Sequence, residues 1–174
     1  MRPDKQLVYR FKDKVYAFAY YYLGDRQDAE EVAQDVLLKL WHHCETLTDE
    51  RITPWVMRVT RNVSIDYLRK RETRRGHELV DSEAIAFQLA ESDEKPDEDR
   101  LDDEHFLEEV LVAMRLLKEP QRSIIQLREI HGMSYEEIGA AVNLPLSTVK
   151  VYLHRARRTL RDSLSERIRH GLNV

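Results

Sequence analysis

A cluster of basic side chains lies near the C-terminal end of the chain, and its chemistry suits binding of an anion. Its members are Lys150, Arg155, Arg157, Arg158 and Arg161. No carboxylate precedes any of them by four residues, the spacing at which opposite charges pair along a helix. Arginine and lysine bond both phosphates and the edges of guanine. The cluster therefore predicts contact with nucleic acid, and the alternative is an ordinary solvated helix face.

Two short helices joined by a tight turn are predicted to position this cluster. Ser134 and Glu137 have the spacing of a capping box, residues 143–145 break the chain, and Ser147 is expected to cap the second helix. The second helix would pack on the first through an apolar stripe of Val149, Leu153, Ala156 and Leu160. This pattern is a helix-turn-helix, whose second helix fits a DNA major groove. The outward face of that helix carries Thr148, Lys150, Val151, His154, Arg155 and Arg158.

A second basic helix is predicted from Pro54 to about residue 75, with Thr53 as its cap. Residues 58–75 include seven basic and two acidic side chains. The helix dipole accounts for basic residues at the C-terminal end. It does not account for Arg58, Arg61 and Asn62 in the first half, which therefore predict a second contact with nucleic acid. The alternative is again a solvated basic surface.

Carboxylates line the outer face of a helix predicted to follow Asp25. Paired carboxylates can serve acid–base catalysis or metal binding, but no His or Cys lies at ligand spacing among them, and no Gly-rich phosphate loop accompanies them. The consecutive residues 42–44 (His-His-Cys) cannot all turn toward one metal ion. We therefore expect no catalytic residue, no metal site and no cofactor. The helix dipole explains the carboxylates of the first turn, which are Asp28, Glu30 and Glu31.

The net charge of −4 conceals a division along the chain. Counting Lys and Arg against Asp and Glu, residues 1–75 carry +3, residues 76–109 carry −12 and residues 110–174 carry +5. The chain has few Gly and Pro and no strongly alternating stretch, which favours helices over strands. We expect an all-α fold of two small helical domains, 1–75 and 101–174, joined by a flexible acidic linker at 76–100.

The cellular location is predicted from the apolar segments. The N-terminal sequence has no apolar signal core, and the longest apolar run, residues 15–23, is much shorter than the roughly 18 residues of a membrane helix. The sequence thus predicts a cytoplasmic protein without direct membrane insertion. Its single cysteine, Cys44, excludes an intrachain disulfide.

The run SYEEIGAAVNLPLSTVKVYLHRARRTL, residues 134–160, resembles the minus-35-binding helix-turn-helix of bacterial extracytoplasmic-function (group IV) sigma factors. These proteins are the initiation subunits of RNA polymerase. The resemblance implies that residues 101–174 form a sigma4-like domain. It also implies minus-35 DNA contacts from Ser147, Thr148, Lys150, Val151, His154, Arg155 and Arg158.

Two further blocks extend the resemblance over nearly the whole chain and imply a sigma2-like domain at residues 1–75. DRQDAEEVAQDVLLKLW (25–41) resembles the family helix that binds the clamp helices of the polymerase beta-prime subunit, which implies core polymerase contacts from Asp28, Glu31, Gln34, Asp35 and Leu38. WVMRVTRNVSIDYLRKR (55–71) resembles the minus-10 recognition and melting helix, which implies DNA contacts from Arg58, Arg61, Asn62, Arg69 and Arg71. By the same resemblance, the loop before Pro54 helps to form a pocket for one flipped base.

The resemblance implies core RNA polymerase, through its beta-prime clamp helices and beta flap, and promoter DNA as partners. It also implies control by an anti-sigma factor, which is common in the family. One rival hypothesis is a helix-turn-helix repressor that binds duplex DNA as a dimer without polymerase, and another is an enzyme or metal-binding protein that uses the His and carboxylate clusters. DNA binding with and without core polymerase tests the first rival, and metal analysis tests the second.

Overall fold

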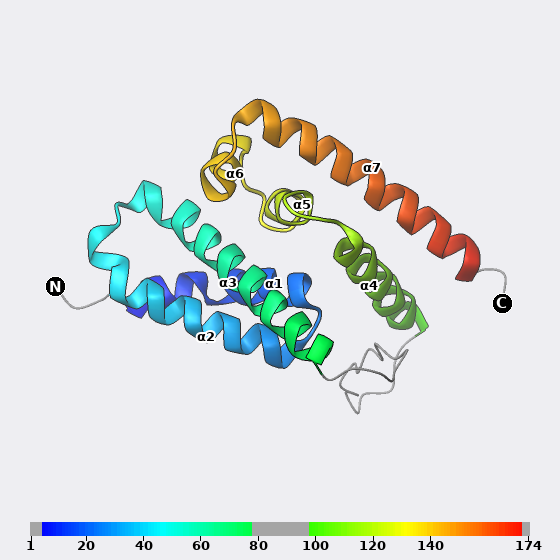
Figure 1. Ribbon diagram of the computed structural model, residues 1–174, viewed down its shortest axis with the longest axis horizontal. Coiled ribbons are helices and arrows are strands. Elements are labelled where there is room, and N and C mark those ends of the chain that lie inside the picture. Colours follow the sequence, from blue (N-terminus) through cyan, green and yellow to red (C-terminus); the bar gives the residue numbers. More distant parts are fainter. Residues whose placement is uncertain (1–4, 78–97, 172–174) are drawn as a thin grey trace.

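The computed structural model describes residues 5–77 and 98–171, with the side chains of 77, 98–103 and 171 left out (Figure 1). Every regular element in these two ranges is a helix, which confirms the predicted all-α fold for this part of the chain. The elements are α1 (Lys5–Leu23), α2 (Arg26–His43), a short 3-10 helix η1 (Cys44–Thr46), α3 (Asp49–His77), α4 (Glu98–Leu116), α5 (Gln121–Glu129), α6 (Tyr135–Val142) and α7 (Leu146–Gly171). The predicted acidic linker falls mainly on residues 78–97, outside the described residues.

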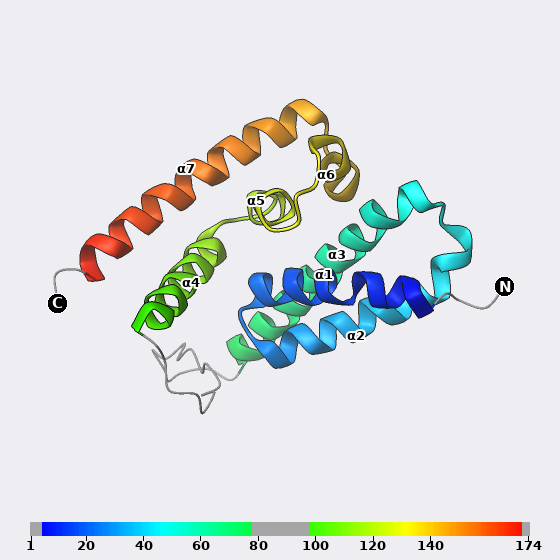
Figure 2. The ribbon, with the colours of Figure 1, turned by 180° about the vertical axis from the view of Figure 1, so that it is seen from behind.

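The first three long helices pack against one another as the first domain (Figures 1 and 2). Apolar residues at helical spacing make the inner side of α1, which is buried from Phe11 to Tyr22, and α2 faces it with an apolar band that includes Val36 and Leu40. Gly24 ends α1 with φ +73°, a backbone conformation that favours glycine. The next residue caps α2, since the Asp25 carboxylate accepts a hydrogen bond from the backbone N–H of Asp28 at 2.9 Å.

The start of α3 differs from the prediction. The helix begins at Asp49, five residues before Pro54, and Thr53 is therefore not its cap. Ile52 explains the longer helix, because its side chain is only 4% exposed and extends the buried side by one turn. Pro54 has no backbone N–H, so the carbonyl of Glu50 lacks a hydrogen-bond donor within the helix. Glu50 is exposed, and water can donate to this carbonyl instead.

The helix-turn-helix consists of α6 and α7. The predicted capping box of α6 is confirmed, because the backbone N–H of Glu137 donates to Ser134 Oγ at 3.1 Å and the backbone N–H of Ser134 donates to Glu137 Oε2 at 2.8 Å. Asn143 then adopts the left-handed conformation, with φ 56°. The helix α7 begins at Leu146, so Ser147 lies inside its first turn and the predicted Ser147 cap is wrong. The apolar stripe from Val149 to Leu160 packs inward as predicted.

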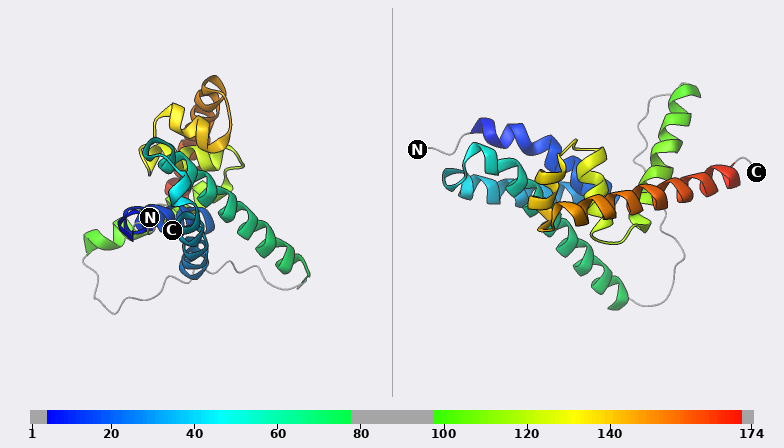
Figure 3. Two further views of the ribbon diagram at one scale, coloured as in Figure 1. Left: turned by 90° about the vertical axis from the view of Figure 1, so that its left-hand side faces the viewer. Right: turned by 90° about the horizontal axis from the view of Figure 1, so that it is seen from above.

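The second domain is completed by α4 and α5. The side chains of Val110, Met114 and Leu117 pack into a cluster with α5 and α7, as the sequence pattern predicts. Phe106 lies at helical spacing from Val110, where the sequence pattern predicts a buried side chain, but it is 54% exposed. The N-terminal end of α4 projects away from the other helices (Figure 3).

The two domains pack directly on each other and share one hydrophobic core. Helix α3 contacts α6, and α1 contacts both α4 and α5 (Figure 3). Arg115 of α4 reaches across this interface, and its guanidinium lies close to Gly24. A Cβ atom at position 24 would lie only 2.8 Å from Arg115 Nη1. The sequence pattern did not predict this close contact between domains.

Candidate nucleic-acid interface

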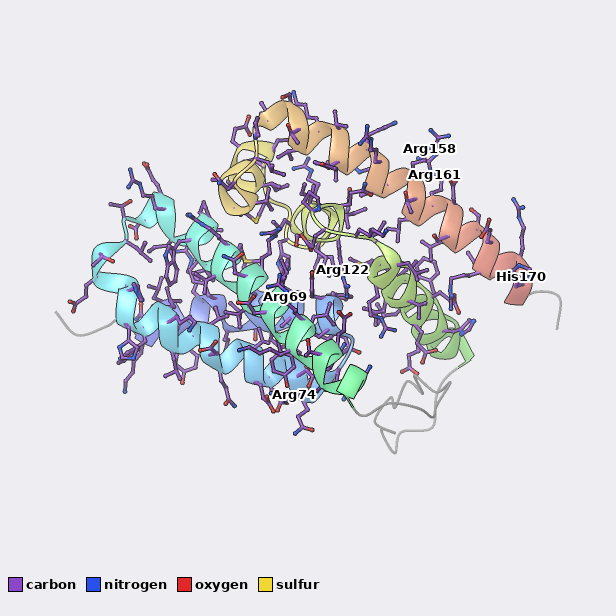
Figure 4. The ribbon with its side chains drawn as sticks, in the orientation of Figure 1. Arg69, Arg74, Arg122, Arg158, Arg161 and His170 are labelled. Atoms are coloured by element: carbon purple, nitrogen blue, oxygen red, sulfur yellow. The ribbon has the colours of Figure 1, made fainter. Side chains whose placement is uncertain are left out.

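The outward face of α7 is the first candidate surface. Most side chains of this face are exposed, and Thr148 is half-buried; the exposed ones are Lys150, Val151, His154, Arg155 and Arg158. The apolar stripe of the same helix, formed by Val149, Leu153 and Ala156, is buried. Figure 4 shows Arg158 and Arg161 extending from α7 on the side away from the other helices. A shallow depression of about 240 Å³ lies on this face, lined by Ser147, Thr148, Val151, Tyr152 and Arg155. The helix therefore presents a basic, partly apolar face that suits a DNA groove.

One basic residue of the predicted cluster has a partner. Arg157 forms an ion pair with Glu129 of α5 at 2.5 Å, so the expectation that its charge is uncompensated was wrong. The partner lies 28 residues away in the sequence, and helical spacing within α7 could not predict it. This contact fixes α7 on α5 and leaves DNA contact to the other basic residues.

The exposed side of α3 is the second candidate surface. Arg58 and Asn62 are exposed in the first half of the helix. Arg69 is exposed further along the helix, and its Nη1 lies 3.8 Å from Asp66 Oδ1 as an ion pair. Pairs this exposed contribute at most about 1 kcal/mol to stability, so Arg69 can leave Asp66 at small cost.

Arg61 does not lie free on this surface. Its Nη2 donates to Glu119 Oε2 at 3.0 Å and its Nε donates to Ser123 Oγ at 3.1 Å. Glu119 and Ser123 belong to the second domain. Only 18% of the Arg61 side chain is exposed, so in this arrangement the second domain covers a residue predicted to contact minus-10 DNA.

Arg71 is also engaged within the protein. Its Nη1 forms an ion pair with Asp28 at 2.5 Å and its Nη2 donates to the carbonyl of Leu23 at 3.3 Å. The hydroxyl of Tyr67 donates to Asp28 at 3.0 Å and to Glu31 at 2.9 Å, and burial together with these carboxylates raises the pKa of Tyr67. The network joins α2 to α3, so Asp28 and Arg71 have a structural role that the sequence did not predict.

The outer face of α2 carries the remaining candidate polymerase contacts. Glu31, Gln34 and Asp35 are exposed, and Asp35 pairs with Lys39 one turn away at 3.2 Å. Leu38 is 60% exposed on the same helix. An exposed leucine beside carboxylates is typical of a protein-binding surface, where an apolar anchor is surrounded by polar groups.

A group of hydrogen-bonded polar residues where the two domains meet was not predicted. Glu119 Oε1 accepts hydrogen bonds from the Tyr22 hydroxyl at 2.9 Å and from Ser123 Oγ at 2.5 Å. Arg122 donates to the backbone carbonyl of Tyr22, its guanidinium lies 4.1 Å from the centre of the Tyr22 ring, and it is 7% exposed (Figure 4). The one sequence signal was a charged residue, Arg122, two positions before the apolar pair at 124–125 of a short helix.

Two further kinds of site are absent from residues 5–77 and 98–171. No group of three or more His, Cys, Asp and Glu side chains there is placed to hold a metal ion. Within the same ranges, no helix has the length and apolar character needed to cross a membrane.

The fold and these surfaces define a two-domain helical DNA-binding protein. Comparison with family models matches residues 7–74 to Sigma-70 region 2 and residues 107–160 to Sigma-70, region 4. The chain belongs to the extracytoplasmic-function sigma factors of bacteria, which confirms the resemblance drawn from the sequence.

Similar proteins support this assignment. The RNA polymerase sigma-E factor of Streptomyces antibioticus is 31% identical over 144 residues, which cover 82% of this chain and 74% of that protein. The ECF RNA polymerase sigma factor SigE of Mycolicibacterium smegmatis is 29% identical over 161 residues, which cover 92% of this chain but 61% of that longer protein. The sigma factor RpoE of Bartonella quintana, solved in complex with the anti-sigma factor NepR, shares the fold with a TM-score of 0.70 at 24% identity, over 92% of this chain and 96% of that one.

Proposed function

We propose that this chain directs core RNA polymerase to specific promoters in the cytoplasm. In this proposal α7 binds the minus-35 element, α3 contacts and opens the minus-10 element, and α2 docks on the polymerase beta-prime subunit. The observation that carries the proposal is the presence, in one chain, of two sigma regions that each display an exposed basic helix. The protein supplies binding and positioning, and its own side chains catalyse no reaction.

The DNA chemistry divides between the two helices. On α7, Lys150, Arg155 and Arg158 would bond phosphates and guanine edges, while exposed Val151 would contact a thymine methyl group. On α3, Arg58 and Asn62 would hold the separated strand, because an opened duplex must be stabilised by phosphate neutralisation and by sites for unstacked bases. Arg61 joins this surface only after its contact with Glu119 opens.

Regulation by an anti-sigma factor belongs to the same proposal. The RpoE structure with a similar fold contains the anti-sigma factor NepR. An inhibitor that keeps the two domains of this chain together would keep Arg61 on Glu119, and it would prevent polymerase binding only if it also covered the exposed face of α2. Release of such an inhibitor would then permit transcription.

Transcription in vitro tests the proposal. Core polymerase and the purified chain are incubated with genomic DNA fragments, and transcript start sites are mapped. We expect start sites that share two sequence elements at constant spacing and that disappear when the chain is omitted. Strong, site-specific duplex binding by the chain alone, with no gain from core polymerase, would instead support the repressor hypothesis.

A matched pair of variants tests the role of α7. Arg155→Gln removes an arginine from the candidate groove-binding face, and Arg169→Gln removes another exposed arginine near the far end of the helix. We expect Arg155→Gln to lower promoter-specific transcription about tenfold, the effect of losing one base or phosphate contact, and Arg169→Gln to leave it nearly unchanged. Equal losses in both variants would argue against α7 as the minus-35 reader.

A further inference from the structure

A cavity of about 380 Å³ lies where the two domains meet. Its wall comes from the C-terminal half of α3 in the first domain, and from the end of α4 and the start of α5 in the second. A volume of this size falls within the range of small-molecule binding sites. None of the proposed contacts with polymerase or promoter DNA uses the cavity as a whole.

Positive charge is concentrated on the wall of the cavity. Four arginines line it, and Glu72 is the one acidic residue among the lining side chains, so the lining carries a net charge of +3. The arginines are Arg71, Arg75, Arg115 and Arg122. Asp28 offsets part of this charge through its ion pair with Arg71. Guanidinium groups remain charged in proteins, so the repulsion between them is relieved by an anion and not by loss of a proton.

Burial and mutual repulsion both act on two of these arginines. Burial is the main cause that lowers the pKa of Arg115, and the neighbouring charges of Arg71 and Arg167 lower it further. Burial also lowers the pKa of Arg122, where the charges of Arg115 and Arg71 oppose the favourable charges of Tyr22 and Glu119. An anion in the cavity would stabilise the charged form of both side chains.

The hydrogen-bonding capacity of two of these arginines, Arg71 and Arg122, is not filled by the protein. The Nε atoms of Arg71 and Arg122 are buried and have no acceptor, although other nitrogens of both side chains donate to carbonyl or carboxylate oxygens. A buried donor without an acceptor is costly and uncommon in folded proteins. Small rotations of these guanidiniums toward a bound oxyanion would satisfy the unused donors.

The rest of the wall is apolar. Leu68, Val112 and Leu116 line the cavity beside the arginines, and Leu116 is 64% exposed although it is a large aliphatic side chain. A ligand that consisted only of charge would leave these side chains in water. The wall therefore fits a molecule with both an anionic and an apolar part.

We propose that the cavity between the two domains binds a small molecule that carries two or more phosphate or carboxylate groups next to an apolar or aromatic part. The anionic groups contact the arginines, whose planar guanidiniums pair with both kinds of oxyanion. The apolar part lies against Leu68, Val112 and Leu116. Because both domains form the wall, the bound ligand favours the arrangement in which they are docked. The binding itself does not depend on the proposed promoter function.

Isothermal titration calorimetry on the full chain, without DNA or polymerase and at physiological salt, tests this inference. The probes are ATP, which combines phosphates with an aromatic base, pyrophosphate and citrate, which supply the anionic groups alone, and adenosine, which supplies the base alone. We expect one saturable site for ATP, with affinity about tenfold higher than for pyrophosphate or citrate and with no detectable binding of adenosine. Binding of citrate or pyrophosphate as tight as that of ATP would contradict the proposed contact between an apolar part of the ligand and the wall.

Neighbouring arginines supply a matched control. Arg75 lines the cavity, whereas Arg74 lines only a neighbouring depression, which shares Arg71 with the cavity. We expect Arg75→Gln to weaken the binding of the tightest probe about tenfold and Arg74→Gln to change it less than about twofold. Arg75 is exposed, so its replacement should leave folding intact, and circular dichroism checks this.

A second pair tests the apolar wall. Leu116→Ser changes the cavity, and Leu107→Ser changes another exposed leucine of α4 that does not line it. We expect only Leu116→Ser to remove the advantage of ATP over pyrophosphate. The inference is wrong if no probe shows saturable binding at millimolar concentration. It is also wrong if Arg74→Gln or Arg158→Gln weakens binding as much as Arg75→Gln, because the probe would then be attracted to basic surfaces in general.

Discussion

At the residue scale, Glu119 is the acceptor around which the contact between the domains is organised. Its carboxylate accepts hydrogen bonds from Tyr22, Arg61 and Ser123. Two of these donors belong to the first domain, and Arg61 is a predicted minus-10 DNA contact. The Glu119 carboxylate therefore binds the Arg61 guanidinium, which a DNA phosphate would contact in the proposed complex.

Replacing Glu119 should make Arg61 available to DNA. In Glu119→Gln the negative charge is lost, and the ion pair, whose side chains are 18% and 27% exposed, contributes on the order of 1 kcal/mol. We expect the free variant to bind a single-stranded minus-10 oligonucleotide about fivefold more tightly than the wild type, measured by fluorescence anisotropy. Glu104→Gln, which removes an exposed carboxylate of α4, is the control for the change in net charge. An equal gain in both variants would reject a specific role for Glu119.

At the element scale, α5 and the turn that follows it carry much of the contact with the first domain. All side chains from Arg122 to Leu127 are buried. His131 follows the helix, and its ring lies 5.9 Å from the ring of Phe18 in α1. The Nε2 atom of His131 is buried without a hydrogen-bond partner. The turn therefore brings a titratable group into an apolar contact between domains.

Stability should fall in mild acid because of His131. Burial is the main cause that lowers the pKa of His131 to about 4, and the charge of Lys14 lowers it further, from a usual value of 6.5. The unfolded chain therefore binds a proton between these pH values while the folded chain does not, so stability is lost as the pH falls from 6.5 toward 4. We expect a loss of about 2 kcal/mol at pH 5 from this group, measured by urea denaturation.

Two variants isolate this contribution from that of the carboxylates. His131→Phe retains a ring against Phe18 but cannot titrate, so its stability should change less between neutral pH and pH 5 than that of the wild type. His105→Gln replaces a histidine whose side chain is 69% exposed and should follow the wild type. If His131→Phe shows the same pH dependence as the wild type, the histidine does not control acid stability.

At the scale of the whole molecule, the docked domains are too close together to contact both promoter elements at once. The minus-35 and minus-10 elements lie roughly 25 base pairs apart, which is about 85 Å at 3.4 Å per base pair. In the structure α3 contacts α6 directly, and α6 is part of the helix-turn-helix. Promoter binding as proposed therefore requires that the domains separate.

Energy transfer between two dyes should detect this separation. Cysteines are placed at Lys12 of α1 and Arg169 of α7, both exposed, in a Cys44→Ser background. We expect high transfer efficiency in the free chain and a large decrease when core polymerase is added, since the polymerase would hold the domains apart. A pair within the first domain, at Lys12 and Thr48, should not change. Unchanged transfer in the first pair on polymerase binding would contradict the opening.

Much of the fold was predicted because its signals are local in the sequence. The capping box of Ser134 and Glu137 spans three residues, and the buried stripes of α1, α2 and α7 repeat at helical spacing. The family resemblance also rests on contiguous runs, and it is confirmed by the matched regions. The roles of the individual DNA and polymerase contacts stay predictions, although most of these residues are exposed.

Contacts between distant residues were decided only by the tertiary structure. Arg61 and Glu119 are 58 residues apart, and Asp28 and Arg71 are 43 residues apart. Helical periodicity shows which side of a helix is buried, but it does not show which other helix covers that side. The sequence alone therefore determined the helices, their apolar stripes and the family. Packing of the two domains decided which charged residues are paired and which remain exposed, because that depends on the faces that meet in three dimensions.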